Sequence, residues 1–141
     1  MKKLLAFAVA AFAPLAVAEQ MAVHGDYQVH YNAMPTADLA ADVAKAYGIE
    51  RSRSRGLLTV SVLRKNKLGG TEPVTAKVAA TATNLNNQLV AIQPREIKEG
   101  PAIYYIGEFR VTPPDTLKFG VVATPAGGKE TRTEFQKQFF K

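Results

Sequence analysis

The stretch Pro101-Ala102-Ile103-Tyr104-Tyr105-Ile106-Gly107-Glu108-Phe109-Arg110-Val111 decides the fold class. Its side chains alternate with a period of two, which is the period of a β-strand. One side carries Ile103, Tyr105, Phe109 and Val111, and the other carries Tyr104, Ile106, Glu108 and Arg110. A strand that is apolar on one side and half apolar on the other is typical of the interior of a β-sandwich. We therefore expect the other strands to pack around this one.

Small side chains are expected opposite the two large aromatic ones. The segment 74–83 alternates as a long strand, with valine and alanine on one face: Val74, Ala76, Val78, Ala80 and Ala82. A face of small residues fills a core only if large side chains meet it. We predict that Tyr105 and Phe109 pack against this face.

Further strand patterns recur along the chain, separated by turn signals. They cover residues 26–32, 57–63, 89–92 and 117–121, and a final strand carries Thr133, Phe135 and Phe139. About seven strands with turns every 8–12 residues predict an all-β, antiparallel, immunoglobulin-like β-sandwich. A small open barrel is the alternative. Residues 85–88 read as a hairpin turn and Pro94 stops the strand at 89–92, which predicts an edge strand. Residues 19–23 are expected to be a loose leader.

One short helix is predicted after the first strand. Thr36 is the expected N-cap, and Leu39, Val43 and Tyr47 then recur every four residues as an apolar stripe. Gly48 can end the helix in the left-handed conformation. A helix of this length is marginal alone, so we expect it to dock on the sandwich.

The N-terminus has the three-part pattern of a secretory signal peptide. A Lys-Lys start, an apolar run from Leu4 to Val17 and the small-x-small site Ala16-Val17-Ala18 follow one another. We predict a signal peptide over residues 1–18, cleavage after Ala18 and a periplasmic location. Residues 19–141 are then one β-sandwich domain, with no transmembrane span in the mature chain.

Composition excludes several chemistries. There is no Cys, so thiol redox chemistry, Cys nucleophiles and Cys-based metal sites are absent. Loss of Lys2 and Lys3 with the leader lowers the formal net charge from +6 to +4. A mild positive charge favours an anionic partner, such as a component of the cell envelope. No nucleic-acid motif is present, and we expect neither a nucleic-acid partner nor a cofactor.

Catalytic patterns are weak. His24 and His30 are about 20 Å apart in an extended strand, so they cannot chelate one metal ion, and no metal site is predicted. The nucleophile motif Gly-x-Ser-x-Gly is absent. Three glutamates could form a carboxylate pair, but each has a cation nearby in sequence: Glu96, Glu99 and Glu108 beside Arg95, Lys98 and Arg110. A small enzyme using His30 or a Glu pair stays open as an alternative, and it predicts a pocket that holds His30 or Glu108.

Three arginines form the most distinctive polar pattern. Arg51, Arg53 and Arg55 alternate with serines, so in an extended run they share one face. Guanidinium groups suit the recognition of carboxylate or phosphate. The alternative is a solvated segment whose arginines pair with Glu50, Glu96 or Glu108. Tyr47, Tyr104 and Glu108 complete the candidate binding residues. For Tyr104 we also expect a structural role, a hydrogen bond to the backbone at a strand corner.

Five segments carry a resemblance to a known family: residues 25–32, 46–52, 81–85, 95–97 and 102–109. The block Tyr47-Gly48-Ile49 followed by Arg51-Ser52 is the most recognisable. The chain resembles a family of small exported proteins of Gammaproteobacteria that is known only as a domain of unknown function. The resemblance implies export and a single β-rich domain. It brings no known activity, catalytic residue or cofactor.

We interpret the chain as a non-catalytic binding module that contacts an anionic ligand or a protein partner through its Arg-rich segment. A structural or chaperone-like protein is a further alternative to the enzyme. It would use an exposed strand edge, with residues 89–92 as the docking edge. A helix covering that edge would argue against it.

Overall fold

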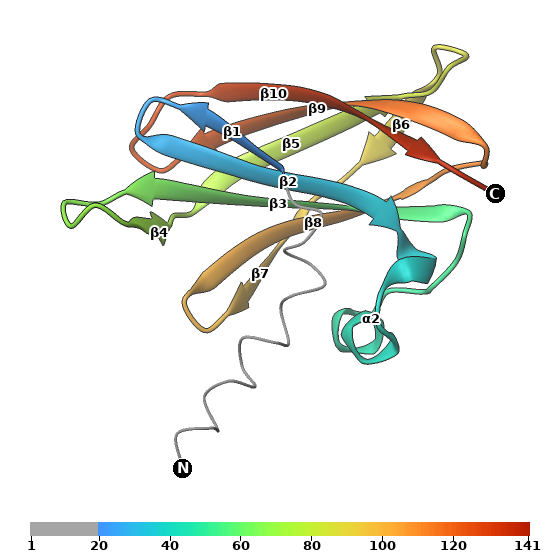
Figure 1. The fold of residues 1–141 in the computed structure, drawn as a ribbon, viewed down its shortest axis with the longest axis horizontal. Coiled ribbons are helices and arrows are strands. Elements are labelled where there is room, and N and C mark those ends of the chain that lie inside the picture. Colours follow the sequence, from blue (N-terminus) through green and yellow to red (C-terminus); the bar gives the residue numbers. More distant parts are fainter. Residues whose placement is uncertain (1–19) are drawn as a thin grey trace.

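Two antiparallel sheets pack face to face in the computed structural model, which describes residues 20–141 (Figure 1). The first sheet has the strand order β1 (Gln20–His24), β2 (Tyr27–Pro35), β3 (Arg55–Lys65), β8 (Ala102–Arg110) and β7 (Arg95–Glu99), and β4 (Thr71–Pro73) pairs with one end of β3. The second sheet has the order β10 (Thr131–Phe139), β9 (Asp115–Pro125), β5 (Ala76–Thr83) and β6 (Leu89–Ile92). The predicted all-β sandwich is confirmed, and neither sheet closes into a barrel.

Two predictions about strands need correction. Residues 20–24 are not a loose leader, because β1 pairs with β2 along its whole length through a turn at Gly25, whose φ is 63°. The strand at 102–110 lies inside the sheet as expected, but β3 lies in the middle. Residues 56–62 of β3 are all buried, since the second sheet covers one face of the strand and the helical segment packs on the other.

The core between the sheets contains the predicted large aromatics. Tyr105 and Phe109 are buried in one cluster with Ala80 and Ala82. The ring of Phe109 meets Phe119 and Phe139 edge to face, with centroids 5.3 Å and 5.8 Å away. Opposed large and small side chains therefore fill the layer as expected, and aromatics from β9 and β10 complete it.

Tyr105 also ties the two sheets together. The backbone N–H of Ala76 in β5 donates a hydrogen bond of 2.8 Å to the phenol oxygen of Tyr105. The phenol donates in turn to the carboxylate of Glu96 in β7, at 3.0 Å. The structure thus gives Tyr105 a bond to the backbone of the kind that we expected for Tyr104.

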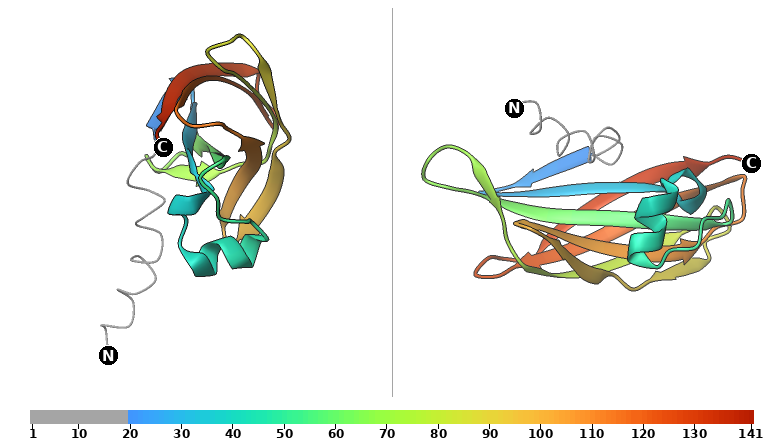
Figure 2. Two further views of the ribbon diagram at one scale, coloured as in Figure 1. Left: turned by 90° about the vertical axis from the view of Figure 1, so that its right-hand side faces the viewer. Right: turned by 90° about the horizontal axis from the view of Figure 1, so that it is seen from below.

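The helical segment follows β2 and lies on the outer face of the first sheet (Figure 2). It consists of a 3-10 turn, η2 (Thr36–Asp38), and the helix α2 (Ala41–Tyr47). Thr36 is not the N-cap, because its hydroxyl group bonds the backbone of Ser52 instead, and Ala40 occupies the cap position of α2. Gly48 ends α2 in the left-handed conformation, as predicted.

A second apolar cluster fixes the helical segment on the sheet. Leu39, Ala44 and Ile49 are buried against Leu57 and Ile106, and Val43 and Tyr47 pack at its border. The stripe seen in the sequence is therefore the docking face of the helix. Within residues 20–141 no helix has the length and hydropathy needed to cross a membrane. The predicted signal peptide lies outside the described residues.

Candidate functional site: a groove at the end of the sandwich

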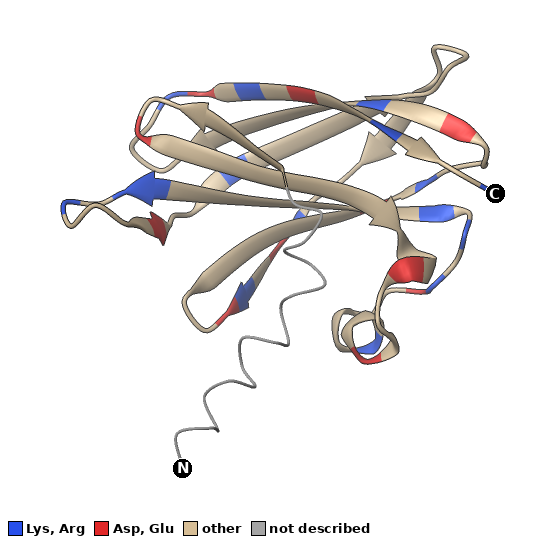
Figure 3. Ribbon diagram, viewed as in Figure 1, with Lys and Arg blue, Asp and Glu red and all other residues tan. Residues whose placement is uncertain are grey.

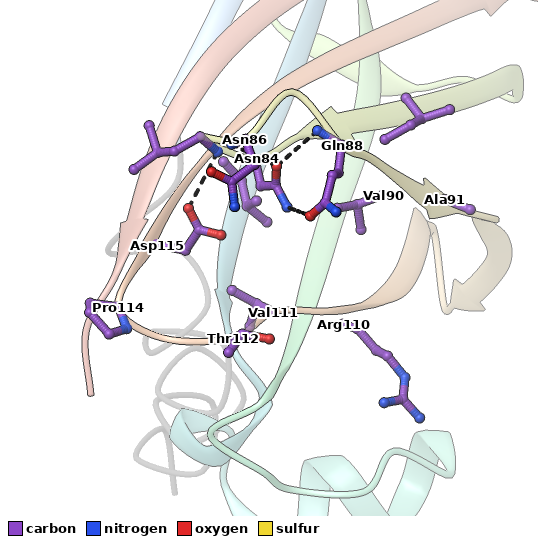
Figure 4. Close-up of a pocket in the computed structure, with 13 residues that line it drawn as sticks. Asn84, Asn86, Gln88, Val90, Ala91, Arg110, Val111, Thr112, Pro114 and Asp115 are labelled. Carbon is purple, nitrogen blue, oxygen red and sulfur yellow. Dashed lines mark hydrogen bonds between the residues drawn. The ribbon is translucent and has the colours of Figure 1, made fainter.

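An open groove of about 930 Å³ lies between the β5–β6 hairpin and the connection from β8 to β9 (Figure 4). We call it the end groove. This volume is in the range of ligand-binding clefts in proteins. The groove is lined by Asn84, Leu85, Asn86, Gln88, Leu89, Val90, Ala91, Arg110, Val111, Thr112, Pro114, Asp115 and Leu117.

One wall is a hairpin held rigid by its own amide groups. The side-chain oxygen of Asn84 accepts hydrogen bonds of 2.9 Å from the backbone N–H groups of Asn86 and Gln88. Its NH₂ group donates to the side-chain oxygen of Gln88 at 2.8 Å (Figure 4). Asn87 has a φ of 62°, a value that asparagine tolerates better than most residues, so the predicted turn is confirmed. The wall is thus fixed before any ligand binds.

The opposite wall is the connection through Thr112, Pro113 and Pro114 to Asp115. The carboxylate of Asp115 accepts from the backbone N–H of Thr116 at 2.7 Å and from that of Leu85 at 3.5 Å. The second bond reaches across to the hairpin and joins the two walls (Figure 4). Asp115 therefore holds the two walls together, and its negative charge is partly compensated by the two backbone N–H groups.

Positive charge gathers at the margin of the groove where β3 begins and β8 ends (Figure 3). Arg55 and Arg110 are directly opposed in the β3–β8 register. Glu108 pairs with Arg55 at 2.9 Å, and both side chains are about two-thirds or more buried. The structure gives Arg110 no ion pair with any residue in the described part of the chain. The other charged residue on the lining, Asp115, is held by backbone N–H groups and not by a cation.

The sequence of this chain matches a known protein family over nearly its whole described length. The domain of unknown function DUF4426 matches residues 21–141. The chain belongs to the DUF4426 family. The resemblance found in the sequence is thereby confirmed.

A crystal structure of a DUF4426 family protein from Pseudomonas aeruginosa PAO1 has the same architecture. It is 30% identical in sequence, with a TM-score of 0.75, and the match covers 89% of this chain and 97% of that one. A search among curated proteins finds no match. The comparisons therefore show a shared DUF4426 fold and leave the activity open.

The three arginines singled out in the sequence do not lie in one extended strand in this DUF4426 domain. Arg51 donates to the backbone oxygen of Ala37, Arg53 lies 3.5 Å from Asp38 at an exposed site, and Arg55 pairs with Glu108. The prediction assumed an extended run, but Thr36 holds Ser52 in a loop and only Arg55 enters a strand. The expected pairing of Arg55 with Glu108 is confirmed, and it replaces the expected pairing of Glu108 with Arg110.

Tyr47 and Tyr104 lie together at the other candidate position, a narrow apolar crevice beside α2. Tyr47 donates a hydrogen bond to Glu99 of β7, and its backbone oxygen accepts one from Arg95. Burial, followed by the bond to Glu99, raises the pKa of Tyr47 to about 12. This tyrosine therefore anchors the helix to the edge strand.

The raised pKa of Tyr47 predicts a loss of stability in alkaline solution. Its pKa is about 12 in the folded state and 10 in the unfolded state, so the unfolded chain gives up the proton first as pH rises. The stabilisation is complete below about pH 10 and is lost between about pH 10 and pH 12. We expect Tyr47→Phe to flatten the fall in the free energy of unfolding over this interval, measured by urea unfolding at each pH.

Tyr105 acts in the same direction in that experiment, because burial raises its pKa as well. The fall should therefore be reduced in Tyr47→Phe and smaller still in Tyr47→Phe/Tyr105→Phe. Tyr31→Phe is a control that leaves both phenols in place. An unchanged slope in Tyr47→Phe would contradict the assignment.

The residues proposed for catalysis are not brought together. His30 lies opposite Ser61 of β3, and Glu108 lies opposite Leu57 of the same strand. Ser61 and Leu57 are four residues apart, which is about 13 Å along the strand. His30 contacts Gln28 at 3.1 Å. Among residues 20–141 no group of three or more His, Asp or Glu could hold a metal ion. The three glutamates of the expected pair have different partners: Tyr105 for Glu96, Tyr47 for Glu99 and Arg55 for Glu108.

Sequence reasoning missed the groove itself. Its walls come from residues 84–91 and 110–117, which only the pairing of the strands brings together. Residues 85–88 read correctly as a turn, but no local pattern indicated that the turn faces Asp115. The sequence indicated an ion pair between Glu108 and Arg110. The register of β3 with β8 brings Arg55 beside Glu108, and Arg55 forms the ion pair instead.

Proposed function

We propose that this protein is a binding module of the bacterial periplasm that holds an acidic segment of a protein partner in the end groove. The observation that carries the proposal is the position of Arg110, a cation on the lining of a preformed groove without an ion pair among the described residues. Guanidinium groups bind carboxylates through paired hydrogen bonds, which gives both affinity and orientation.

The surroundings of Arg110 favour a carboxylate over a neutral group. Arg55 lies opposite Arg110 in the sheet, and the carboxylate of Glu108 pairs with Arg55 and not with Arg110. An acidic side chain that entered here would balance the remaining charge. Arg53 lies in the adjoining loop and is more than half exposed, so it would extend the attraction over a longer distance.

A protein segment fits this groove better than a lipid surface or a charged polymer. The lining mixes amide side chains with Leu89, Val90 and Val111, and such a surface suits a peptide that presents both polar backbone and apolar side chains. Leu85 and Leu89 also line the groove and are 70% and 71% exposed, so they are accessible to apolar side chains of such a peptide. A polyanion would need a broader run of cations than this margin offers.

The location rests on the sequence of the N-terminus. Residues 1–18 have the charge, apolar run and cleavage site of a signal peptide. The resemblance to exported proteins of Gammaproteobacteria supports the same location. Mass spectrometry of the protein from a periplasmic extract should give a chain that begins at Glu19.

The binding proposal is tested with two fluorescent hexapeptides that alternate Val with Thr and carry one Glu, at the first position in one and at the last in the other. We expect at least one to bind, and Arg110→Glu to weaken that binding at least tenfold, as read by fluorescence polarisation. Lys67→Glu is the matched control, because Lys67 is exposed in the β3–β4 hairpin and does not line the groove.

Two other outcomes would overturn the proposal. Equal binding by the wild type, Arg110→Glu and Lys67→Glu would show that the groove is not the site. Binding to vesicles that contain phosphatidylglycerol, with no binding of either peptide, would replace the protein partner by a membrane surface.

A further inference from the structure

We infer that the partner segment binds as an additional β-strand on the free edge of β6, hydrogen-bonded to the backbone of Leu89 and Ala91. This inference rests on the proposed function, since it names the conformation in which the end groove holds its peptide. It assigns the main affinity to backbone groups and leaves the choice of partner to Arg110 and the apolar lining.

The register of the β5–β6 hairpin shows which backbone groups of β6 are free. The backbone N–H of Asn84 donates to the oxygen of Gln88, at 3.1 Å. In an antiparallel pair, hydrogen-bonded and non-hydrogen-bonded positions alternate. Counting from Asn84 and Gln88, the pairs Ala82–Val90 and Ala80–Ile92 are hydrogen-bonded, and Leu89 and Ala91 are not. Leu89 and Ala91 therefore turn their N–H and C=O groups away from β5.

An independent contact on β5 supports this orientation. The N–H of Ala76 points to the β6 side of the strand, because it donates to Tyr105 rather than to β9. Ala80 and Ala82 have the same parity as Ala76 and so direct their N–H groups to that side as well. These are the groups that Val90 and Ile92 bond, which leaves the groups of Leu89 and Ala91 on the outer edge.

The edge of β6 carries no charged side chain, although the strand is short and ends before Pro94. Natural sheets block their edges with charged side chains, proline, bulges or very short edge strands. The other edge strand on this side, β7, has four charged residues in five: Arg95, Glu96, Lys98 and Glu99. β6 has none, Leu89 and Ala91 are both exposed, and α2 lies on the other sheet. The outcome that would argue against an available edge, a helix covering it, is therefore not found.

The free edge and the groove belong to one surface. Leu89, Val90 and Ala91 line the end groove together with Arg110. A peptide strand that pairs with Leu89 and Ala91 therefore lies in the groove, where an acidic residue reaches Arg110. Strand addition of this kind draws affinity from main-chain hydrogen bonds and specificity from alternate side chains.

Charge decides between a partner peptide and a second copy of this chain. Pairing of β6 with β6 of another copy would bring two grooves together, each with an Arg110 on its lining that has no ion pair among the described residues. Like charges in such a position disfavour association. Arg110, which has no ion pair among the described residues, is complementary to an acidic side chain, so we assign the groove to a partner peptide.

Amide hydrogen exchange, followed by NMR on the ¹⁵N-labelled protein, tests the inference. In the free protein the amides of Leu89 and Ala91 should exchange rapidly, and those of Val90 and Ile92 slowly. The hexapeptide that binds should slow exchange at Leu89 and Ala91 at least tenfold. The same peptide with N-methyl groups on alternate residues keeps its charge and loses its strand donors, and it should bind at least tenfold more weakly.

The outcomes separate this inference from the proposed function. If the peptide binds, loses affinity in Arg110→Glu, and leaves exchange at Leu89 and Ala91 unchanged, the groove binds acidic peptides but not as a strand, and the inference is wrong. If neither peptide binds, the proposed function fails and the inference with it. If sedimentation detects a dimer that Ala91→Pro abolishes, the occupant is a second copy and the assignment to a peptide is wrong.

Discussion

Replacement of Phe119 by alanine should lower the free energy of unfolding by about 3–5 kcal/mol, the usual cost of removing a buried aromatic side chain. Phe119 is 2% exposed and lies between two other rings. It stacks on Phe135 with centroids 4.8 Å apart and meets Phe109 edge to face at 5.3 Å. The rings that remain cannot fill the cavity without leaving their own contacts, so most of the loss should persist.

Urea unfolding followed by circular dichroism measures this loss, since the chain has no Trp for fluorescence. Phe140→Ala is the control, because Phe140 is 65% exposed and its removal should change the free energy of unfolding by less than about 0.5 kcal/mol. Similar effects of the two substitutions would mean that the aromatic cluster is not the core.

The second large effect is expected from Gly56→Ala in β3. A Cβ at this position would lie 2.3 Å from ring atoms of Phe109, which faces Gly56 across the β3–β8 ladder. The ring cannot move aside, because Phe119 and Phe139 hold it in the core. Overpacking of this kind costs about 1–3 kcal/mol and sometimes more.

A double-mutant cycle gives this prediction its sharpest test. Phe109→Leu removes the ring atoms that meet the new methyl group, so Gly56→Ala should cost less in that background, by at least about 1 kcal/mol. Gly120→Ala is the matched control, because it lies within a strand but a Cβ there makes only an ordinary contact, 3.5 Å from Thr81. Additive losses in the double variant would contradict the explanation.

The alternation of residues 101–111 was sufficient to predict the sandwich and its inner face. Large residues alternate with polar ones there, and strand geometry turns that pattern directly into two faces. β3 was harder to place, because Leu57 and Leu58 are adjacent and both buried. A strand buried on both faces needs a layer on each side. The second sheet covers one face of β3, and the helical segment with α2 covers the other after the chain has folded back on the sheet.

Local patterns failed where a distant residue determines the conformation. The Arg-rich segment alternates like a strand, but Thr36 bonds the backbone of Ser52 on both sides and holds it in a loop. The region of β1 was expected to be a loose leader, and it forms a strand because the edge of β2 offers it backbone partners. The end groove left no signal in the sequence for the same reason, since its two walls are far apart in the chain.

The order in which the strands pair determines how much of the chain must be present before the sheets can form. β3 pairs with β8 and β5 pairs with β9, so each sheet joins early strands to late ones. The rings of Phe109, Phe119 and Phe139 also belong to the late strands. A growing chain that ends before β8 has hairpins but no aromatic layer to bury, and contacts between distant segments form slowly. A chain that ends before β8 therefore completes neither sheet, and the aromatic layer closes only when the last strands are present.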